Sequence, residues 1–147
     1  MKDLFIDTNN AVKLNRPQTG NFRSLYLWLK SDEEALLVVS QKLLVEYYRS
    51  CGSRSGFSFI LDNLTRFGRM KKFEKSEIEE FKCQYYRKIR FRSNKEDQEL
   101  IPIVLLSERK YALTSDINLK YDLENFPKFG KLVKVSNDPD NIPYNEI

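Results

Sequence analysis

Two short runs of consecutive apolar residues, each followed at once by polar residues, constrain the fold of this chain more than any other feature. They span 4–6 and 35–39, and Asp7 and Ser40 follow them directly. A short unbroken apolar run is typical of a strand buried on both faces of a parallel sheet, because a half-solvated strand alternates instead. Together with two later segments of similar character, the expected strands are 4–6, 35–39, 111–114 and 132–135.

Between these segments, apolar residues recur at helical spacing. They are Phe22, Leu25 and Leu29, then Leu43, Leu44 and Tyr47, and later Leu100, Ile101, Val104 and Leu105. The alternation of strands and helices predicts an α/β fold, a three-layer sandwich with a central, mostly parallel sheet. The segment from Ser50 to Asn94 has no convincing strand and is interpreted as a helical insertion. We therefore expect one domain over 1–136, with the insertion at about 50–94 and a loosely ordered tail over 137–147.

The length and composition fit one globular domain without a membrane span. The chain has 147 residues, of which 41% are hydrophobic, enough for a single buried core. Its longest apolar runs have five and six residues, far short of the roughly 18 that a membrane-spanning helix needs. The apolar run near the N-terminus is also too short for a signal peptide. We expect a soluble, cytoplasmic protein whose two cysteines, Cys51 and Cys83, are reduced thiols.

The chain contains no histidine. This excludes a Ser-His-Asp triad, a Cys-His pair and a histidine-based zinc site. Any catalysis must therefore rest on carboxylates, lysines, tyrosines, serines or cysteines.

Four carboxylates lie where one edge of a parallel sheet would gather them. Asp7 and Asp116 follow expected strands, Glu46 lies on the helix after the second strand, and Asp97 precedes the helix that leads to Asp116. Ligands bind beyond the carboxyl ends of parallel strands. Each acid alone is more typical of a turn, a helix cap or a solvated helix face, but their joint placement predicts one pocket. Four carboxylates at close range repel one another, and a divalent cation with oxygen ligands, Mg²⁺ or Mn²⁺, relieves the repulsion.

These acids and the residues around them resemble the PIN-domain nucleases, from Leu4 to about Val135. The matching segments are Phe5-Ile6-Asp7-Thr8-Asn9, Val38-Val39-Ser40, Glu46, Asp97 and Leu113-Thr114-Ser115-Asp116. The resemblance implies a compact α/β fold and hydrolysis of RNA phosphodiester bonds that depends on Mg²⁺ or Mn²⁺. In that family pattern the four acids bind the metal. Asn9 and either Thr114 or Ser115 support them through hydrogen bonds.

One departure from the family pattern concerns the third acid. Pro102 falls five residues after Asp97, where the family usually has a small helix-forming residue. A proline inside a helix removes a backbone hydrogen bond and kinks the helix. If the helix starts later, Glu96 or Glu99 takes the place of Asp97.

The segment 66–95 is strongly basic. It has eleven Lys and Arg against four Glu, a net charge of +7, and because the whole chain is +4, the remainder is −3. Such polarity suits a protein that attracts a polyanion. The residues expected to bind RNA are Arg66, Arg69, Lys71, Lys72, Arg87, Lys88, Arg90 and Arg92. The interleaved Phe67, Phe73, Tyr85, Tyr86 and Phe91 have two interpretations, as stacking surfaces for bases or as core aromatics beneath a solvated face.

The sequence therefore predicts a metal-dependent endoribonuclease. The alternative is a catalytically inactive PIN-like module that binds nucleic acid or serves as a scaffold. Within the nuclease interpretation, a toxin and an RNA-processing enzyme both remain open. The PIN-domain toxins that the chain resembles are commonly homodimers neutralised by a small antitoxin, so the expected partners are RNA, an antitoxin protein and a second copy of the chain.

Overall fold

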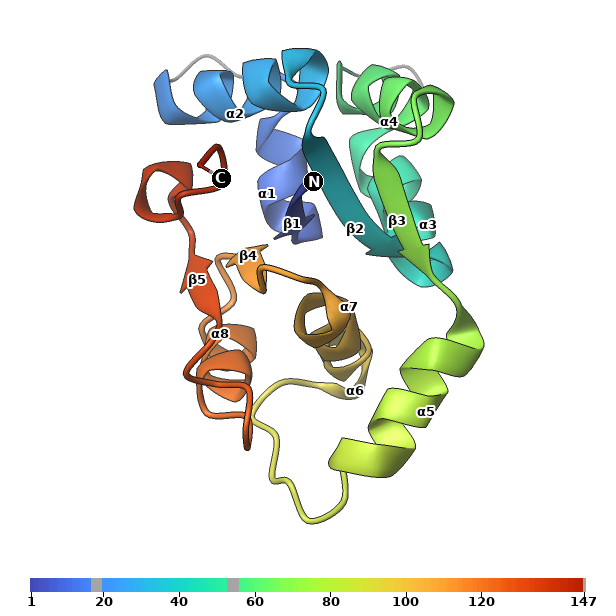
Figure 1. The fold of residues 1–147 in the computed structure, drawn as a ribbon, viewed down its shortest axis with the longest axis vertical. Coiled ribbons are helices and arrows are strands. Elements are labelled where there is room, and N and C mark those ends of the chain that lie inside the picture. Colours follow the sequence, from blue (N-terminus) through green and yellow to red (C-terminus); the bar gives the residue numbers. More distant parts are fainter. Residues whose placement is uncertain (17–19, 53–55, 147) are drawn as a thin grey trace.

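The computed structural model describes residues 1–16, 20–52 and 56–146, and a five-stranded sheet forms its centre (Figure 1). The strands are β1 (Lys2–Ile6), β2 (Ala35–Ser40), β3 (Met70–Phe73), β4 (Tyr111–Leu113) and β5 (Lys134–Ser136). All neighbours pair in parallel, in the order β3-β2-β1-β4-β5. The predicted α/β fold is confirmed, and this strand order is consistent with PIN-like topology.

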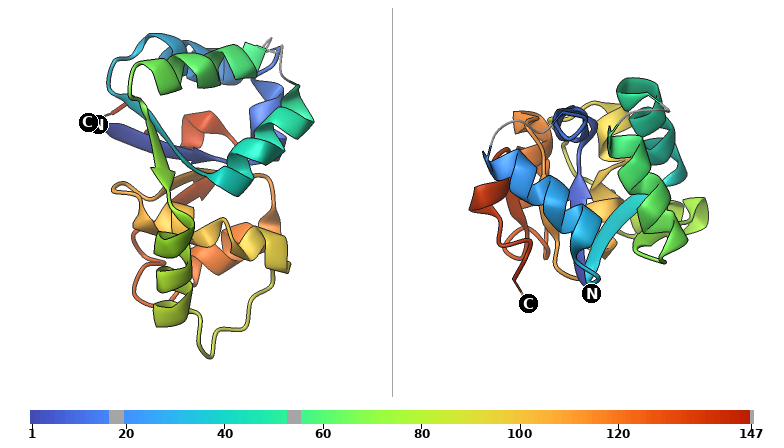
Figure 2. Two further views of the ribbon diagram at one scale, coloured as in Figure 1. Left: turned by 90° about the vertical axis from the view of Figure 1, so that its right-hand side faces the viewer. Right: turned by 90° about the horizontal axis from the view of Figure 1, so that it is seen from above.

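Helices cover both faces of the sheet. They are α1 (Thr8–Lys13), α2 (Gly20–Ser31), α3 (Gln41–Cys51), α4 (Gly56–Arg66), α5 (Lys75–Tyr85), α6 (Lys95–Gln98), α7 (Ile101–Leu106) and α8 (Ile117–Glu124). The first four lie on one face and the last four on the other (Figures 1 and 2). This follows from right-handed crossovers: the chain moves from β1 outward to β3, then returns to the other side of β1, so the later helices pack on the opposite face. Within the described ranges, no helix is long and apolar enough to cross a membrane.

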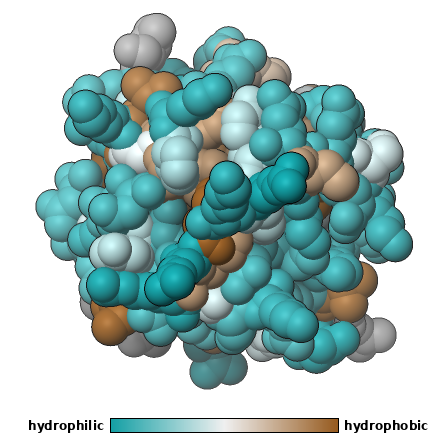
Figure 3. Space-filling view, turned by 90° about the horizontal axis from the view of Figure 1, so that it is seen from below, coloured by the Kyte–Doolittle hydropathy of each residue, from teal (hydrophilic) through white to brown (hydrophobic). Residues whose placement is uncertain are grey.

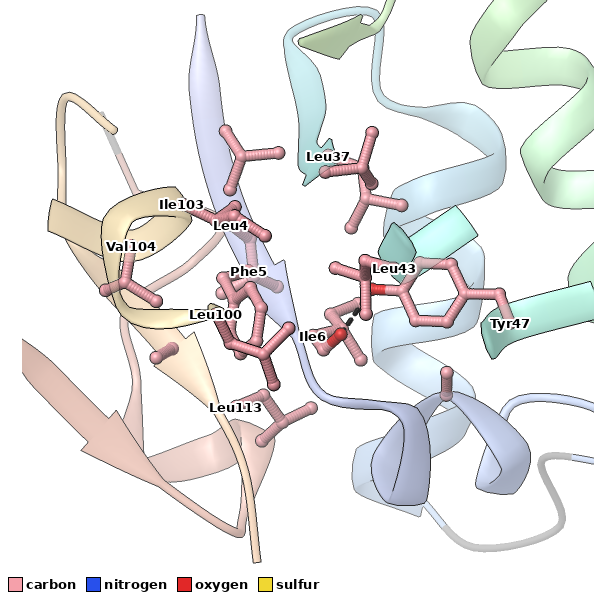
Figure 4. Packing of buried hydrophobic residues seen from close by; sticks show 14 of the residues in the cluster. Leu4, Phe5, Ile6, Leu37, Leu43, Tyr47, Leu100, Ile103, Val104 and Leu113 are labelled. Atoms are coloured by element: carbon pink, nitrogen blue, oxygen red, sulfur yellow. Dashed lines mark hydrogen bonds between the residues drawn. The ribbon is translucent and has the colours of Figure 1, made fainter. Parts of the chain in front are cut away.

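The central strand β1 is buried on both faces. Leu43 and Tyr47 of α3 pack on one side of it, and Ile103 and Val104 of α7 pack on the other (Figure 4). Burial on both sides explains why the residues of β1 form an unbroken apolar run.

The prediction of no strand between Ser50 and Asn94 was wrong, because β3 lies within this segment. The sequence of β3, Met-Lys-Lys-Phe, has no apolar run from which a strand could be predicted. The reason is that β3 is an edge strand that pairs only with β2, so that Lys71 and Lys72 are exposed. Exposed lysines are common on edge strands, where they discourage pairing with other chains. The segment therefore completes the sheet as well as supplying helices α4 and α5.

The tail beyond β5 is packed, not loosely ordered as expected. Ile142 and Tyr144 are buried, and the ring of Tyr144 meets Trp28 of α2 edge-on, with 5.0 Å between the ring centroids. Arg109 donates hydrogen bonds from its guanidinium to the carbonyl oxygens of Tyr144 and Glu146. The described end of the chain lies beside its start (Figure 2).

Candidate metal centre and nucleic-acid interface

The edge of the sheet where β1 and β4 end is the natural place for a site. The strand order reverses between these two neighbouring strands, since the chain continues from β1 to β2 on one side and reaches β4 on the other. Open α/β sheets bind ligands at such a switch point, beyond the carboxyl ends of the strands. Asp7 directly follows β1, and Asp116 comes three residues after the end of β4. This edge lies opposite the chain ends (left view of Figure 2).

Asp7 is a buried carboxylate held by two donors. It caps α1, accepting a hydrogen bond from the backbone N–H of Thr8 at 2.8 Å, and its other oxygen accepts one from Thr114 Oγ1 at 2.6 Å. Burial raises the pKa of Asp7 above its ordinary value, and the charge of Asp116 acts in the same direction, against the two hydrogen bonds.

Asp116 caps α8 in a similar way. Its Oδ1 accepts hydrogen bonds from the backbone N–H groups of Asn118 and Leu119, at 2.9 and 3.1 Å. Its own N–H donates to Thr114 Oγ1 at 3.1 Å. Thr114 therefore links the two acids.

Glu46 is brought to the same edge by two contacts of α3 with the residues on either side of Asp7. Thr8 Oγ1 donates to Glu46 Oε2 at 3.1 Å. The hydroxyl of the buried Tyr47 donates to the carbonyl oxygen of Ile6, the residue before Asp7 (Figure 4). Burial, and then the charge of Asp7, raise the pKa of Tyr47 well above its ordinary value, so the hydroxyl remains a donor.

Asp97 completes the group of four acids. It lies in α6, where Asn94 caps the helix and accepts a hydrogen bond from the Asp97 N–H at 2.8 Å. Partial burial, a side-chain hydrogen bond with Asp116 and the charge of Asp116 raise the pKa of Asp97 to about 6, and the charges of Asp7 and Glu46 add to this effect. The four predicted acids therefore act on one another electrostatically.

The structure favours Asp97 over the two alternatives for the third acid. Glu99 forms an ion pair with Lys82, with 2.7 Å between Oε1 and Nζ, and Glu96 is exposed. Pro102 does not kink a helix, because it lies in the first turn of the separate helix α7. The N–H groups of a first helical turn have no partner within the helix, so a proline there costs no hydrogen bond.

The carboxylate oxygens of the four acids are ligands that suit a hard divalent cation. However, these side chains do not converge on a single point. Over residues 1–16, 20–52 and 56–146, no three acidic, cysteine or histidine side chains meet closely enough to hold a metal ion. Asp7 is held instead by its two donors, and Asp97 lies near enough to Asp116 for that carboxyl group to raise its pKa. Binding an ion would require rotation of these side chains.

Two further residues, Ser115 and Asn9, were predicted to support the acids through hydrogen bonds, and they differ in their surroundings. Ser115 accepts a hydrogen bond at Oγ from Nδ2 of Asn10, at 3.3 Å. Asn9 is exposed, whereas Asn10 is fully buried. Sequence reasoning missed Asn10 and also Thr8. Helical spacing was the available signal for Asn10, because it lies four residues before the buried Leu14 and therefore on the same face of α1.

Arg69 is not available to RNA, and its assignment as an RNA-binding residue was wrong. Its side chain is buried, and its guanidinium donates to the carbonyl oxygens of Leu29 at 3.0 Å and Asp32 at 2.6 Å. It thereby gives carbonyl groups at the end of α2 a charged donor, in a turn whose last carbonyls have no partner within the helix.

The other basic residues of the predicted RNA-binding set are exposed: Arg66, Lys71, Lys72, Arg87, Lys88, Arg90 and Arg92. The last four lie in the loop over residues 86–94, which leads into α6 and hence to Asp97. This loop is at the bottom of Figure 1, and the face seen from below is largely hydrophilic (Figure 3). Asp122 of α8 fixes the end of the loop by accepting hydrogen bonds from the N–H groups of Arg92 and Ser93.

Most of the interleaved aromatic residues belong to the core. Phe73 is buried, and Tyr85, Tyr86 and Phe91 pack against the core. Phe67 alone among the five is strongly exposed, at 65%. The interpretation as core aromatics is therefore correct for four of the five.

Comparisons of the chain with protein-family models, with curated proteins and with solved structures give no match.

Proposed function

We propose that this protein is an endoribonuclease that uses Mg²⁺ or Mn²⁺ to hydrolyse RNA phosphodiester bonds. The observation that carries the proposal is that the acids lie at one edge of the sheet, where Thr114 joins Asp7 to Asp116 and Thr8 holds Glu46. Burial, and then Asp116, Asp7 and Glu46, raise the pKa of Asp97 at the same edge. A protein that holds four carboxylates in mutual repulsion at a topological switch point gains most from a bound cation.

Asp7, Glu46, Asp97 and Asp116 would hold the ion. A bound divalent cation supplies a more acidic water molecule and compensates the charge that develops on the phosphate oxygens. The protein's own residues orient the site: Thr114 joins Asp7 to Asp116, Thr8 holds Glu46, and Asn94 caps the turn that carries Asp97. A cytoplasmic location, where RNA is abundant, is part of this proposal.

One observation favours the second candidate, an inactive PIN-like module that binds nucleic acid. No three acids of the described residues meet closely enough to hold an ion as they stand. Titration of the metal-free protein with Mn²⁺ separates the two candidates, because only the nuclease needs a divalent cation at the acids.

The direct test is cleavage of a labelled single-stranded RNA. We expect cleavage with Mn²⁺ or Mg²⁺ and none in EDTA. Asp116→Asn should lower the rate by more than about a hundredfold, since even residues that only orient metal ligands cost 10–100-fold. Asparagine caps helices as well as aspartate does, so α8 should remain intact.

Asp140→Asn is the matched control, because Asp140 is exposed and lies in the tail. This variant should cleave at the unmodified rate. Undiminished cleavage in EDTA, or by Asp116→Asn, would contradict the proposal.

A further inference from the structure

The exposed side of α8 carries two large side chains shortly after Asp116. Ile117 is 80% exposed, the largest exposed fraction among the large apolar side chains of the described residues, and the exposed Tyr121 follows four residues later. Residues four apart lie on the same face of a helix. Because Asp116 caps α8, this face begins beside one of the four acids and leads away from it.

Arg92 extends this face from the loop over 86–94. Its Cζ lies 3.4 Å from the centroid of the Tyr121 ring. At that distance the guanidinium carbon itself touches the ring, so the planar group lies flat on it; an edge-on guanidinium would contact the ring through a nitrogen and hold its carbon farther away. Arg92 is exposed, and the side of its guanidinium turned away from the ring is therefore open to a ligand.

The pair of Arg92 and Tyr121 lies close to the acids. Asp97 follows Arg92 by five residues, and Asp116 precedes Tyr121 by five. The N–H of Arg92 donates to Asp122 of α8, which fixes the loop beside this helix (Figure 1). With a helical rise of about 1.5 Å per residue, Tyr121 lies about 7 Å along α8 from Asp116. This is comparable with the span of one nucleotide, so a strand with a phosphate at the acids brings a neighbouring base to Arg92.

The charges around Tyr121 limit the path of such a strand. Lys120 is exposed beside the ring, and the exposed Glu124 lies one turn beyond it. The carboxylate of Glu124 repels phosphate and closes the far end of the face. The strand therefore leaves across Arg92 toward the basic loop, where Arg90 is exposed and attracts phosphate.

We propose that Arg92, held flat by Tyr121, is a stacking platform for one unpaired base of the RNA, and that Ile117 contacts the same nucleotide on the side of the acids. The proposal rests on the ribonuclease function and adds a subsite to it. Unpaired bases of RNA stack on guanidinium planes. Since every base has a π face, the platform accepts all four bases.

The test measures by anisotropy the binding of fluorescent oligoadenylate and of an abasic strand of equal length, with Ca²⁺ as the divalent cation. The two strands carry the same phosphates, and only the first carries bases. Arg92→Lys keeps the positive charge but removes the plane. We expect this variant to bind oligoadenylate about tenfold more weakly, within the range that one stacked base supplies, and to bind the abasic strand as the unmodified protein does.

Arg90→Lys is the matched control, because Arg90 is exposed in the same loop and the substitution is the same. Its affinity for oligoadenylate should stay within about twofold of that of the unmodified protein. The hydrogen bond to Asp122 comes from the backbone of residue 92, so Arg92→Lys retains it and the loop should keep its position.

The possible outcomes are distinguishable. If oligoadenylate does not bind the unmodified protein, the proposed function fails together with the platform. If Arg92→Lys leaves its binding unchanged, weakens the binding of both strands alike, or behaves as Arg90→Lys does, the platform is wrong and the ribonuclease proposal stands. If the platform behaves as expected but Mn²⁺ supports no cleavage, the inactive nucleic-acid-binding module replaces the ribonuclease.

Discussion

Asp97 is protonated more readily in the folded protein than in the unfolded chain. Its pKa is raised from the ordinary value of 3.8 to about 6, chiefly by partial burial and then by the neighbouring Asp116. A carboxyl group with a raised folded-state pKa contributes stability that is present below about pH 4 and is lost as the pH rises through about 6. Without metal, the folded state is therefore strained electrostatically at neutral pH.

We predict that Asp97→Asn stabilises the metal-free protein in a pH-dependent way. In EDTA at pH 8 its melting temperature should exceed that of the unmodified protein, because a neutral amide does not repel Asp116. At pH 4 the two should melt within about a degree of each other. Thermal unfolding at several pH values measures this, and a lower melting temperature at pH 8 would contradict it.

Arg69 provides a second prediction for a single residue. Arg69→Met should lower the free energy of unfolding by about 2 kcal/mol, because carbonyl groups at the end of α2 lose a charged donor. The neighbouring exposed Arg66 is the control, and Arg66→Met should change stability by less than about 0.5 kcal/mol. Urea unfolding measures both, and equal effects would show that the buried contacts of Arg69 contribute nothing.

At the scale of elements, the loop over 86–94 is the part of the basic segment that leads directly to Asp97 in α6. Neutralising Arg87, Lys88, Arg90 and Arg92 together should weaken RNA binding and flatten its salt dependence. The plot of log affinity against log salt should lose about 0.7 of slope for each phosphate contact removed. Arg92 already stacks on Tyr121, with 3.4 Å from Cζ to the ring centroid, so we expect it to contribute least.

The control for this prediction neutralises four exposed basic residues elsewhere: Arg23, Lys30, Lys131 and Lys134. It changes the net charge equally but leaves the loop intact. An identical slope in the two quadruple variants would exclude the loop as the RNA contact.

The sequence predicted the buried strands well because burial on both faces leaves a plain signal in consecutive residues, as at Leu4–Ile6. It did not predict β3, since an edge strand with exposed lysines has no apolar run. The acids Asp7 and Asp116 could be placed because strand ends are recognisable. The burial of Arg69 could not be predicted, because its partners lie about 40 positions away in the sequence.

For the molecule as a whole, the charge is divided between a basic segment of +7 and a remainder of −3. If the proposed ribonuclease is a toxin, expressing the chain in a bacterial host should arrest growth, and Asp7→Asn should be harmless. Asparagine keeps the cap of α1, so the variant should accumulate as a folded protein. Growth at the normal rate with the unmodified protein would favour an RNA-processing enzyme or an inactive module.

A toxin of this kind needs an inhibitor. In that case we expect a small antitoxin protein whose arginine pairs with the acids, since a guanidinium replaces the charge of the cation. We also expect a homodimer, which light scattering of the Asp7→Asn variant would detect.

The pairing of β1 with β4 has a consequence for synthesis on the ribosome. Thr114 and Asp7 are 107 positions apart in the sequence. Their hydrogen bond can therefore form only after β4 has paired with β1. Contacts between such distant parts of a chain form late in folding. A nascent chain therefore carries Asp7 and Glu46 long before Asp116 is available, and the centre is assembled only once nearly the whole domain has left the exit tunnel. If the proposed ribonuclease function holds, an unfinished chain would leave the RNA of its own ribosome intact.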